Sequence, residues 1–209
     1  MPEPIRVPPC APARLVVLAS GTGSLLQSLL EAATGDYPAR VVAVITDRDC
    51  RAGAIAADAG IPAVTVALGD YPDRGTWDTA VTAATASHEP DVVVSAGFMK
   101  ILAPQFLSRF PGRVLNTHPA LLPAFPGAHA VHDALNYGVR VTGCTVHVVD
   151  SGVDTGPILA QQAVEVLEGD DENTLHERIK VIERRLLVDV LAAIAIHGMR
   201  ISGRKATIG

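Results

Sequence analysis

The sequence of 209 residues has few of the features that mark secreted or membrane proteins. Its three cysteines, Cys10, Cys50 and Cys144, are odd in number and widely spaced, which argues against a disulfide framework or a thiolate zinc site. No apolar run reaches the ~18 residues that a spanning helix needs, and the start has no signal-peptide core. We therefore expect a soluble, cytoplasmic protein with reduced thiols.

Basic and aromatic residues are also scarce. The net charge of -5 leaves no large basic face for a nucleic-acid backbone, although a local pocket can still hold one phosphate. Aromatic residues make up 4% of the chain, but 48% of it is hydrophobic, which is enough for one full core. These values predict one globular domain, without nucleic acid or membrane as a partner.

Short β-branched runs alternate with stretches rich in Ala and Leu, a pattern typical of strands joined by crossover helices. Their continuous apolar character favours a mostly parallel sheet covered on both faces. The pattern predicts strands at 14–19, 40–46, 63–66, 91–95 and 113–116, and helices at 24–33, 51–59 and 76–88.

The second half of the chain follows a different pattern. Two longer strands are expected at 139–149 and 156–166, as a hairpin or a crossing pair, and one long closing helix at 171–197. The tail to residue 209 is expected to add a short strand. The Pro-rich segment 1–13 is expected to be a mobile leader, which leaves 14–209 as the folded domain.

The most informative motif is Asn116-Thr117-His118-Pro119. Strand alternation points Asn116 and His118 to the same side and Thr117 away, and Pro119 is expected to end the strand there. Both polar groups then lie at the carboxyl end of a strand, where open α/β sheets bind ligands. Asp154, in a later Gly- and Asp-rich turn, adds a carboxylate. An amide, an imidazole and a carboxylate are what acyl transfer requires, to hold an oxyanion and move protons.

Each of these three residues also has a purely structural interpretation. Asn116 can cap a turn, His118 can be an interior histidine with satisfied hydrogen bonds, and Asp154 can bond its own turn amides. The combination at one end of the sheet favours the catalytic interpretation.

A Gly-rich loop, residues 20–24, lies between the first expected strand and helix. Free amides at a helix start favour an anion such as phosphate. A tight turn with Ser24 as helix cap is an equally good interpretation. A dinucleotide site is a third, because Asp47 ends the second strand where a ribose-binding acid would lie, but Leu26 replaces the third glycine of that fingerprint.

The order of several segments resembles that of the folate-dependent formyltransferases. The resemblance extends from Arg14 to the closing helix and implies a single-domain, Rossmann-like fold with a mostly parallel central sheet and an antiparallel C-terminal extension. The matching segments are Ser20–Ser24, Ala96–Leu102, Asn116–Pro123, Gly143–His147 and Asp154–Pro157.

The resemblance implies transfer of a formyl group from 10-formyltetrahydrofolate to the primary amine of glycinamide ribonucleotide. Asn116, His118 and Asp154 match the catalytic positions. Asn116 and protonated His118 would donate to the oxyanion, while Asp154 would orient His118 and help to carry a proton from the amine to the leaving folate nitrogen.

The resemblance also assigns the ligand sites. The charged residues on the closing helix would equally suit a solvated ion-pair face, and the apolar residues would equally suit a buried core. For the ribonucleotide, the residues are Gly21, Thr22, Gly23, Ser24, Leu25, Gly97, Lys180, Glu183 and Arg184. For the folate, they are Met99, Lys100, Ile101, Leu102, Val149 and Asp150, with Arg74 as a weaker candidate for the glutamate tail and a solvated loop arginine as its alternative.

Three residues depart from the family pattern. Lys100 stands where arginine is common and loses the planar fork for carboxylates, Ala120 replaces a frequent serine, and Leu25 replaces an asparagine in the phosphate loop. The spacing of His129, His132 and His147 predicts no metal site, and His147 is expected to be structural.

Two relatives within the family remain as functional alternatives. A 10-formyltetrahydrofolate hydrolase would act on water, and a methionyl-tRNA formyltransferase on an aminoacyl-tRNA. The hydrolase usually has an extra domain before the catalytic one and the tRNA enzyme an extra domain after it, and we expect neither here. The pattern leaves open whether the chain forms a homodimer.

Overall fold

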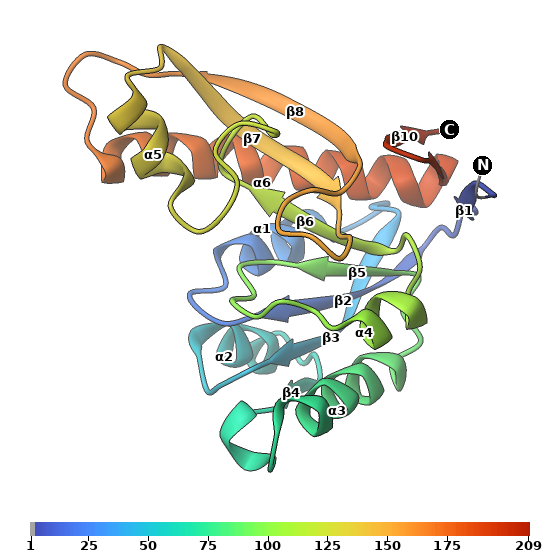
Figure 1. Ribbon diagram of the computed structural model, residues 1–209. Helices are drawn as coiled ribbons and strands as arrows, with labels where there is room; N and C mark the ends of the chain where they lie inside the picture. Colours follow the sequence, from blue (N-terminus) through green and yellow to red (C-terminus); the bar gives the residue numbers. More distant parts are fainter. Residues whose placement is uncertain (1–2) are drawn as a thin grey trace.

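One ten-stranded sheet organises the computed structural model, which describes residues 3–209 (Figure 1). The strands lie in the order β1-β9-β10-β8-β7-β6-β5-β2-β3-β4. The strands are β1 (Ile5–Val7), β2 (Ala13–Ala19), β3 (Ala39–Thr46), β4 (Ala63–Thr65), β5 (Val92–Ser95), β6 (Val114–His118), β7 (Val141–Val148), β8 (Ile158–Glu165), β9 (Met199–Ser202) and β10 (Lys205–Ile208). The helices are α1 (Ser24–Ala32), α2 (Arg51–Asp58), the 3-10 turn η1 (Leu68–Asp70), α3 (Arg74–Ala86), α4 (Pro104–Arg109), α5 (Ala130–Tyr137) and α6 (Glu172–His197).

The half of the sheet formed by β6, β5, β2, β3 and β4 is parallel, and it has helices on both faces. Alternation along β2 explains the two layers. Leu15 and Val17 belong to a core that α1, α2 and α6 cover, whereas Val16 and Leu18 belong to a second core under α3 and α4. The predicted parallel α/β sheet is confirmed.

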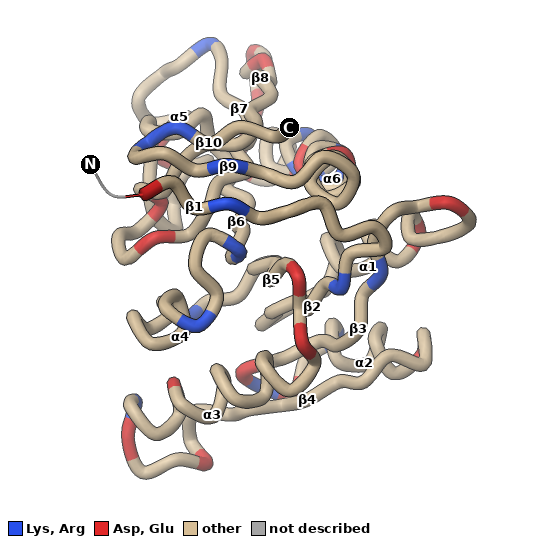
Figure 2. Tube along the Cα trace, turned by 90° about the vertical axis from the view of Figure 1, so that its right-hand side faces the viewer, with Lys and Arg blue, Asp and Glu red and all other residues tan. Residues whose placement is uncertain are grey.

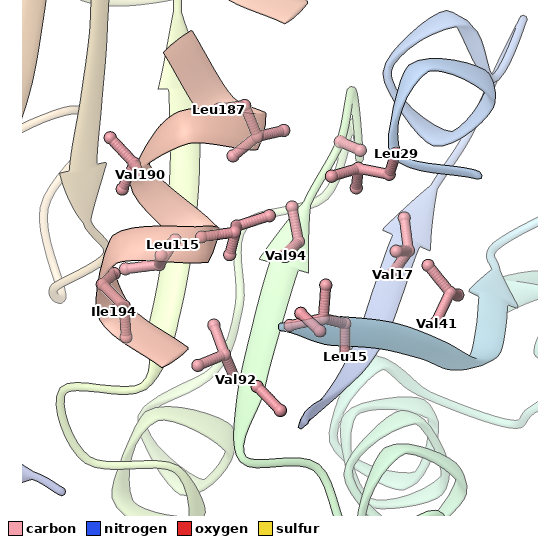
Figure 3. Packing of buried hydrophobic residues seen from close by; sticks show 14 of the residues in the cluster. Leu15, Val17, Leu29, Val41, Val92, Val94, Leu115, Leu187, Val190 and Ile194 are labelled. Atoms are coloured by element: carbon pink, nitrogen blue, oxygen red, sulfur yellow. The ribbon is translucent and has the colours of Figure 1, made fainter. Parts of the chain in front are cut away.

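Helix α6, 26 residues long, closes one face of the sheet. It begins at a capping box in which Asp171 and Thr174 bond each other's backbone amides. Figure 3 shows Leu187, Val190 and Ile194 of α6 against the side chains of β5 and β6. Each such buried side chain contributes about 1.5–3 kcal/mol, so this contact fixes the helix and the polar residues that it carries.

The other half of the sheet contains both antiparallel and parallel strand pairs. β7 runs antiparallel to β6 and β8 antiparallel to β7, so the expected pair of long strands is a hairpin. The tail forms two strands, β9 and β10, rather than the single short strand that we expected. The predicted antiparallel C-terminal extension is therefore confirmed.

Part of the segment expected to be a mobile leader, residues 1–13, lies in the sheet; Met1 and Pro2 lie outside the described residues. β1 pairs antiparallel with β9, and Val7 is only 4% exposed. The amide of Cys10 also donates to the carbonyl of Ala195 at 2.9 Å. Figure 2 shows β1 beside β9, close to the C-terminus. The pairing partner lies almost 200 residues away in sequence, so no local pattern revealed it.

No helix in the described range, 3–209, combines the length and the apolar character needed to cross a bilayer.

We predict that Gly198→Ala destabilises the fold more than Gly203→Ala. Both glycines have positive φ, but a Cβ at Gly198 would lie 2.5 Å from the Val7 carbonyl oxygen, whereas one at Gly203 would meet nothing within 4 Å. The free energy of unfolding should fall by about 1 kcal/mol for Gly203→Ala and by about 3 kcal/mol for Gly198→Ala, measured in urea. Equal losses would contradict the close packing of β1 on the end of α6.

Candidate active site

A cavity of about 620 Å³ opens at the carboxyl end of the parallel strands. It is lined by the β2–α1 loop, the segment after β5, the end of β6, the turn between β7 and β8, and one face of α6. All three expected catalytic residues, Asn116, His118 and Asp154, line it together. An open α/β sheet is expected to bind ligands at this edge.

Strand β6 delivers two of these groups, and it ends at His118, just before Pro119, as predicted. Asn116 and His118 both make side-chain contacts on the Asp154 side of the cavity. Thr117, between them, hydrogen-bonds Glu183 of α6 instead. Asn116 and His118 thus share one side, as the alternation predicts, but Thr117 and Glu183 line the same cavity.

Both ring nitrogens of His118 face oxygen acceptors. Nε2 lies 2.7 Å from the Phe125 carbonyl oxygen, and Nδ1 lies 3.3 Å from Oδ2 of Asp154. A carbonyl and an ionised carboxylate accept hydrogen bonds and cannot donate them. The doubly protonated ring, with one proton on each nitrogen, therefore satisfies both neighbours at once.

Asp154 lies between two imidazoles. Its Oδ1 is 3.6 Å from His147 Nε2, and its Oδ2 accepts from the Gly127 amide at 2.8 Å. The hydrogen bond from His147 lowers the pKa of Asp154, and the Gly127 amide and the charge of His118 add to this against the opposing effect of burial. The carboxyl group is thus held ionised at neutral pH.

His147 lines the cavity, although the sequence analysis assigned it a structural role. The register of β6 and β7 places it directly opposite Asn116. Its Nδ1 lies 3.1 Å from the Val148 carbonyl oxygen, and its Nε2 lies 3.2 Å from Asn116 Nδ2 and 3.6 Å from Asp154 Oδ1. His147 therefore lies between the amide and the carboxylate.

The Gly-rich loop lines the cavity through residues 21–25. Gly23, with φ +73°, is the N-cap of α1 and has no side-chain cap, so the expectation that Ser24 caps the helix is wrong. A Cβ on Gly23 would lie 2.9 Å from Cα of Ala52, which leaves room only for glycine. The first amides of α1 are left without a side-chain acceptor, as an anion site requires.

The alternative assignment of this loop to a dinucleotide does not fit Asp47. The side chain of Asp47 has no exposed surface and already binds Arg48 through both carboxylate oxygens, at 3.2 and 2.9 Å. It is not free to accept from a ribose.

Helix α6 contributes Lys180 and Glu183 to the lining, whereas Arg184 is absent from it. Burial raises the pKa of Glu183, against the hydrogen bond from Thr117 and the charges of Arg184 and Lys180. Lys180 pairs with Glu177 at 2.7 Å. Of the three expected helical residues, two reach the cavity.

The expected folate residues Met99, Lys100, Ile101, Leu102, Val149 and Asp150 all line the cavity, together with Gly97. Met99 and Ile101 are 72% and 68% exposed, so they are not the core residues that the alternative required. Arg74 does not line the cavity. Its guanidinium lies over the Trp77 ring and binds Asp78 and the Ile101 carbonyl. Arg74 therefore holds the folate segment from outside the cavity.

The histidines outside this group have other surroundings. His129 is the N-cap residue of α5, and His132 pairs with Glu172 at 3.5 Å. Within residues 3–209, no three His, Cys, Asp or Glu side chains are grouped as a metal site would need.

The sheet order and this set of polar groups define an α/β group-transfer enzyme. More narrowly, the chain belongs to the formyl transferase family, whose model, described as Formyl transferase, matches residues 13–191. The chain is 74% identical to phosphoribosylglycinamide formyltransferase of Mycobacterium tuberculosis over 209 residues, covering 100% of this chain and 97% of that one.

Solved structures agree with this assignment. Glycinamide ribonucleotide transformylase 1 from Symbiobacterium toebii superposes with a TM-score of 0.91 at 42% identity, covering 94% of this chain and 93% of that one. A formyltetrahydrofolate deformylase from Pseudomonas syringae superposes with a TM-score of 0.87 at 27% identity, covering 94% of this chain but only 65% of that one.

We predict that Asp154 makes the stability of the fold depend on pH under acidic conditions. Its folded-state pKa lies below the ordinary value of 3.8, so its contribution is complete above pH 3.8 and is lost as the pH falls through the folded-state value. Asp154→Asn should therefore be less stable than the wild type at pH 7, and the difference should shrink below pH 3.8. Urea unfolding at pH 7, 5 and 3 measures this; a constant difference would contradict it.

Proposed function

We propose that the protein transfers the formyl group of 10-formyltetrahydrofolate to the primary amine of glycinamide ribonucleotide, a step of de novo purine synthesis. The 74% identity with a phosphoribosylglycinamide formyltransferase over the whole chain carries this proposal. Asn116, His118 and Asp154 support it, because they meet in one cavity between a Gly-rich loop and an exposed apolar segment. The proposal includes a cytoplasmic location, which the free cysteines suit.

The nucleotide occupies the side of the cavity next to α1 and α6. The phosphate binds the amides of residues 21–25 at the start of α1, where the helix dipole favours an anion. Leu25 brings no polar side chain, so the phosphate depends on these backbone amides and on the nearby cation of Lys180. Glu183, which Thr117 orients, accepts from the ribose hydroxyls.

The folate occupies the side formed by residues 97–102 and the turn that starts at Val149. The exposed side chains of Met99 and Ile101 give the pterin and the aminobenzoyl ring an apolar surface that is otherwise in contact with water. Backbone groups of this segment and of the turn read the polar edge of the pterin ring. The formyl group then points toward β6.

The reaction needs one new bond and one broken bond. The amine nitrogen attacks the formyl carbon, a C–N bond forms, and the carbonyl oxygen becomes an oxyanion. Asn116 Nδ2 and His118 donate hydrogen bonds to it. Collapse of the intermediate breaks the bond from the formyl carbon to N10 of the folate. One proton leaves the attacking nitrogen and one reaches N10, and Asp154 serves this transfer directly or through a water.

The hydrogen bonds of His118 indicate which of its protons serves the oxyanion. Nδ1 faces Asp154, which orients the ring. The proton on Nε2 faces the Phe125 carbonyl at 2.7 Å, an uncharged acceptor. An oxyanion is the stronger acceptor, so it displaces the Phe125 carbonyl when it forms. His147 holds Asn116 and Asp154 in register during this exchange.

We predict that the purified protein, mixed with glycinamide ribonucleotide and 10-formyltetrahydrofolate, yields formylated nucleotide and tetrahydrofolate in equal amounts. Chromatographic quantification of both products measures this. The deformylase of similar fold makes hydrolysis the sharpest alternative. Release of formate from the folate, without consumption of nucleotide, would replace the proposed transfer by hydrolysis.

We predict that Asn116→Ala and Asp154→Asn each lower kcat by about 100-fold or more, because each removes a group that acts on the oxyanion or the proton. Asn136→Ala and Asp189→Asn are matched controls, since these residues make only exposed contacts with His132 and Arg185. The controls should keep kcat within about twofold, in line with the small energies of exposed pairs. Steady-state rates and circular dichroism measure activity and folding. Near-normal turnover in either site variant would remove that residue from the mechanism.

A further inference from the structure

Asp47 lies at the end of β3, outside the group of residues that contact the proposed reaction. Its side chain has no exposed surface. Arg48 binds both of its oxygens, and the ammonium of Lys100 lies 3.6 Å from Oδ2. The Ser20 hydroxyl lies beside the same carboxylate and favours its ionised form, and Ser20 Oγ accepts from the Met99 amide at 2.9 Å. One carboxylate thus joins three segments at the edge of the cavity.

We propose that Asp47 is a positioning residue for the folate side of the cavity: through Ser20 it fixes the Met99 amide, and through its ion pair it fixes the ammonium of Lys100. The part of this inference that concerns folate binding, its folate half, rests on the proposed function. The part that concerns the position of the Met99 amide, its structural half, does not.

The segment that Asp47 positions has no regular secondary structure. Residues 97–103, between β5 and α4, belong to no strand or helix, and Gly97 has φ +71°. Contacts from other segments take the place of a ladder. The Ser20 amide donates to the Gly97 carbonyl at 3.2 Å, Ser20 Oγ accepts from Met99, and Arg74 donates to the Ile101 carbonyl. Two of these three contacts come from Ser20.

The orientation of the Ser20 hydroxyl depends on Asp47. A hydroxyl has one proton to donate and lone pairs with which to accept. A carboxylate beside the hydroxyl attracts its proton, and a lone pair is then left for the Met99 amide. Without the carboxylate, the hydroxyl is free to rotate and the Met99 amide loses a fixed acceptor. Hydrogen bonds to an ionised group are also the stronger kind.

Charge supports the same assignment. Burial by itself would raise the pKa of Asp47, but hydrogen bonds from Arg48 and Ser20 and the charges of Arg48 and Lys100 outweigh it and hold the pKa below its ordinary value. The carboxylate is therefore ionised at neutral pH. Lys100 lines the cavity, and its ammonium lies 3.6 Å from Asp47 Oδ2. Removal of the carboxylate would free that cation to move within the folate site.

The test compares Asp47→Ala, Ser20→Ala and Asp47→Asn with Asp170→Asn. Asp170 is a matched control, because Arg178 also binds both of its oxygens, at 2.9 and 2.6 Å, at a turn that does not line the cavity. Hydrogen exchange at the Met99 amide is read without any substrate. Fluorescence of Trp77, the single tryptophan, is a second such readout, because Trp77 stacks on Phe98 at 6.4 Å between ring centroids.

We expect Asp47→Ala and Ser20→Ala to speed exchange at Met99 by about tenfold and to shift the Trp77 emission, the effect of one lost hydrogen bond. Asp47→Asn keeps an oxygen acceptor for Ser20 and should restore most of the protection. In turnover, Asp47→Ala should raise KM for 10-formyltetrahydrofolate by about tenfold, with kcat and the nucleotide KM within about threefold. Asp170→Asn should change none of these quantities.

Unchanged Met99 exchange in Asp47→Ala would overturn the positioning role. A folate KM that rises equally in Asp170→Asn would overturn it too, since the effect would then be general destabilisation. If Asp47→Ala does not fold, Ser20→Ala removes the same relay and decides by the same two readouts. Wild-type protein that is inactive toward both substrates would overturn the proposed function and the folate half, while Met99 exchange still decides the structural half.

Discussion

The site depends on the placement of one carboxylate between two imidazoles. Asp154 contacts His118, His147 and the Gly127 amide, and these three partners come from β6, β7 and the loop before α5. Asp154 itself has φ +53°, a conformation that a non-glycine residue keeps only when its surroundings fix it. The ionised carboxylate offers an acceptor to both rings, and the hydrogen bonds of the rings in turn decide which donors are available to a substrate oxygen.

Packing behind the site keeps these polar contacts in register. The side chains of α6 bury themselves against β5 and β6 on the face opposite α3 and α4, so β6 is covered from both directions (Figure 3). The antiparallel pairing of β6 with β7 then sets Asn116 opposite His147. A slip of one residue in this register would turn His147 to the other face of the sheet and break the link between amide and carboxylate. The apolar core thus specifies the catalytic geometry as well as the fold.

The parts of the molecule that were predictable from the sequence are those with a local signal. Apolar runs gave the parallel strands, and strand alternation gave the common direction of Asn116 and His118. The parts that were missed depend on pairing over long distances. β1 needs β9, and His147 enters the site only because β7 lies beside β6. Likewise, Arg74 was a weaker candidate for the glutamate tail, with a solvated loop arginine as its alternative, and only the packing of α3 shows that its guanidinium is engaged by Asp78 and Ile101.

The edge strand β1 has a practical consequence for anyone who handles the protein. Gly112, just before the start of β6, packs against Ile5 and Ile201, so β1 and β9 lie by the amino ends of the parallel strands, and the described chain both starts and finishes there (Figure 1). The cavity opens at the opposite, carboxyl end. An affinity tag, a surface tether or a fused second protein at either terminus would therefore leave the mouth of the cavity unobstructed.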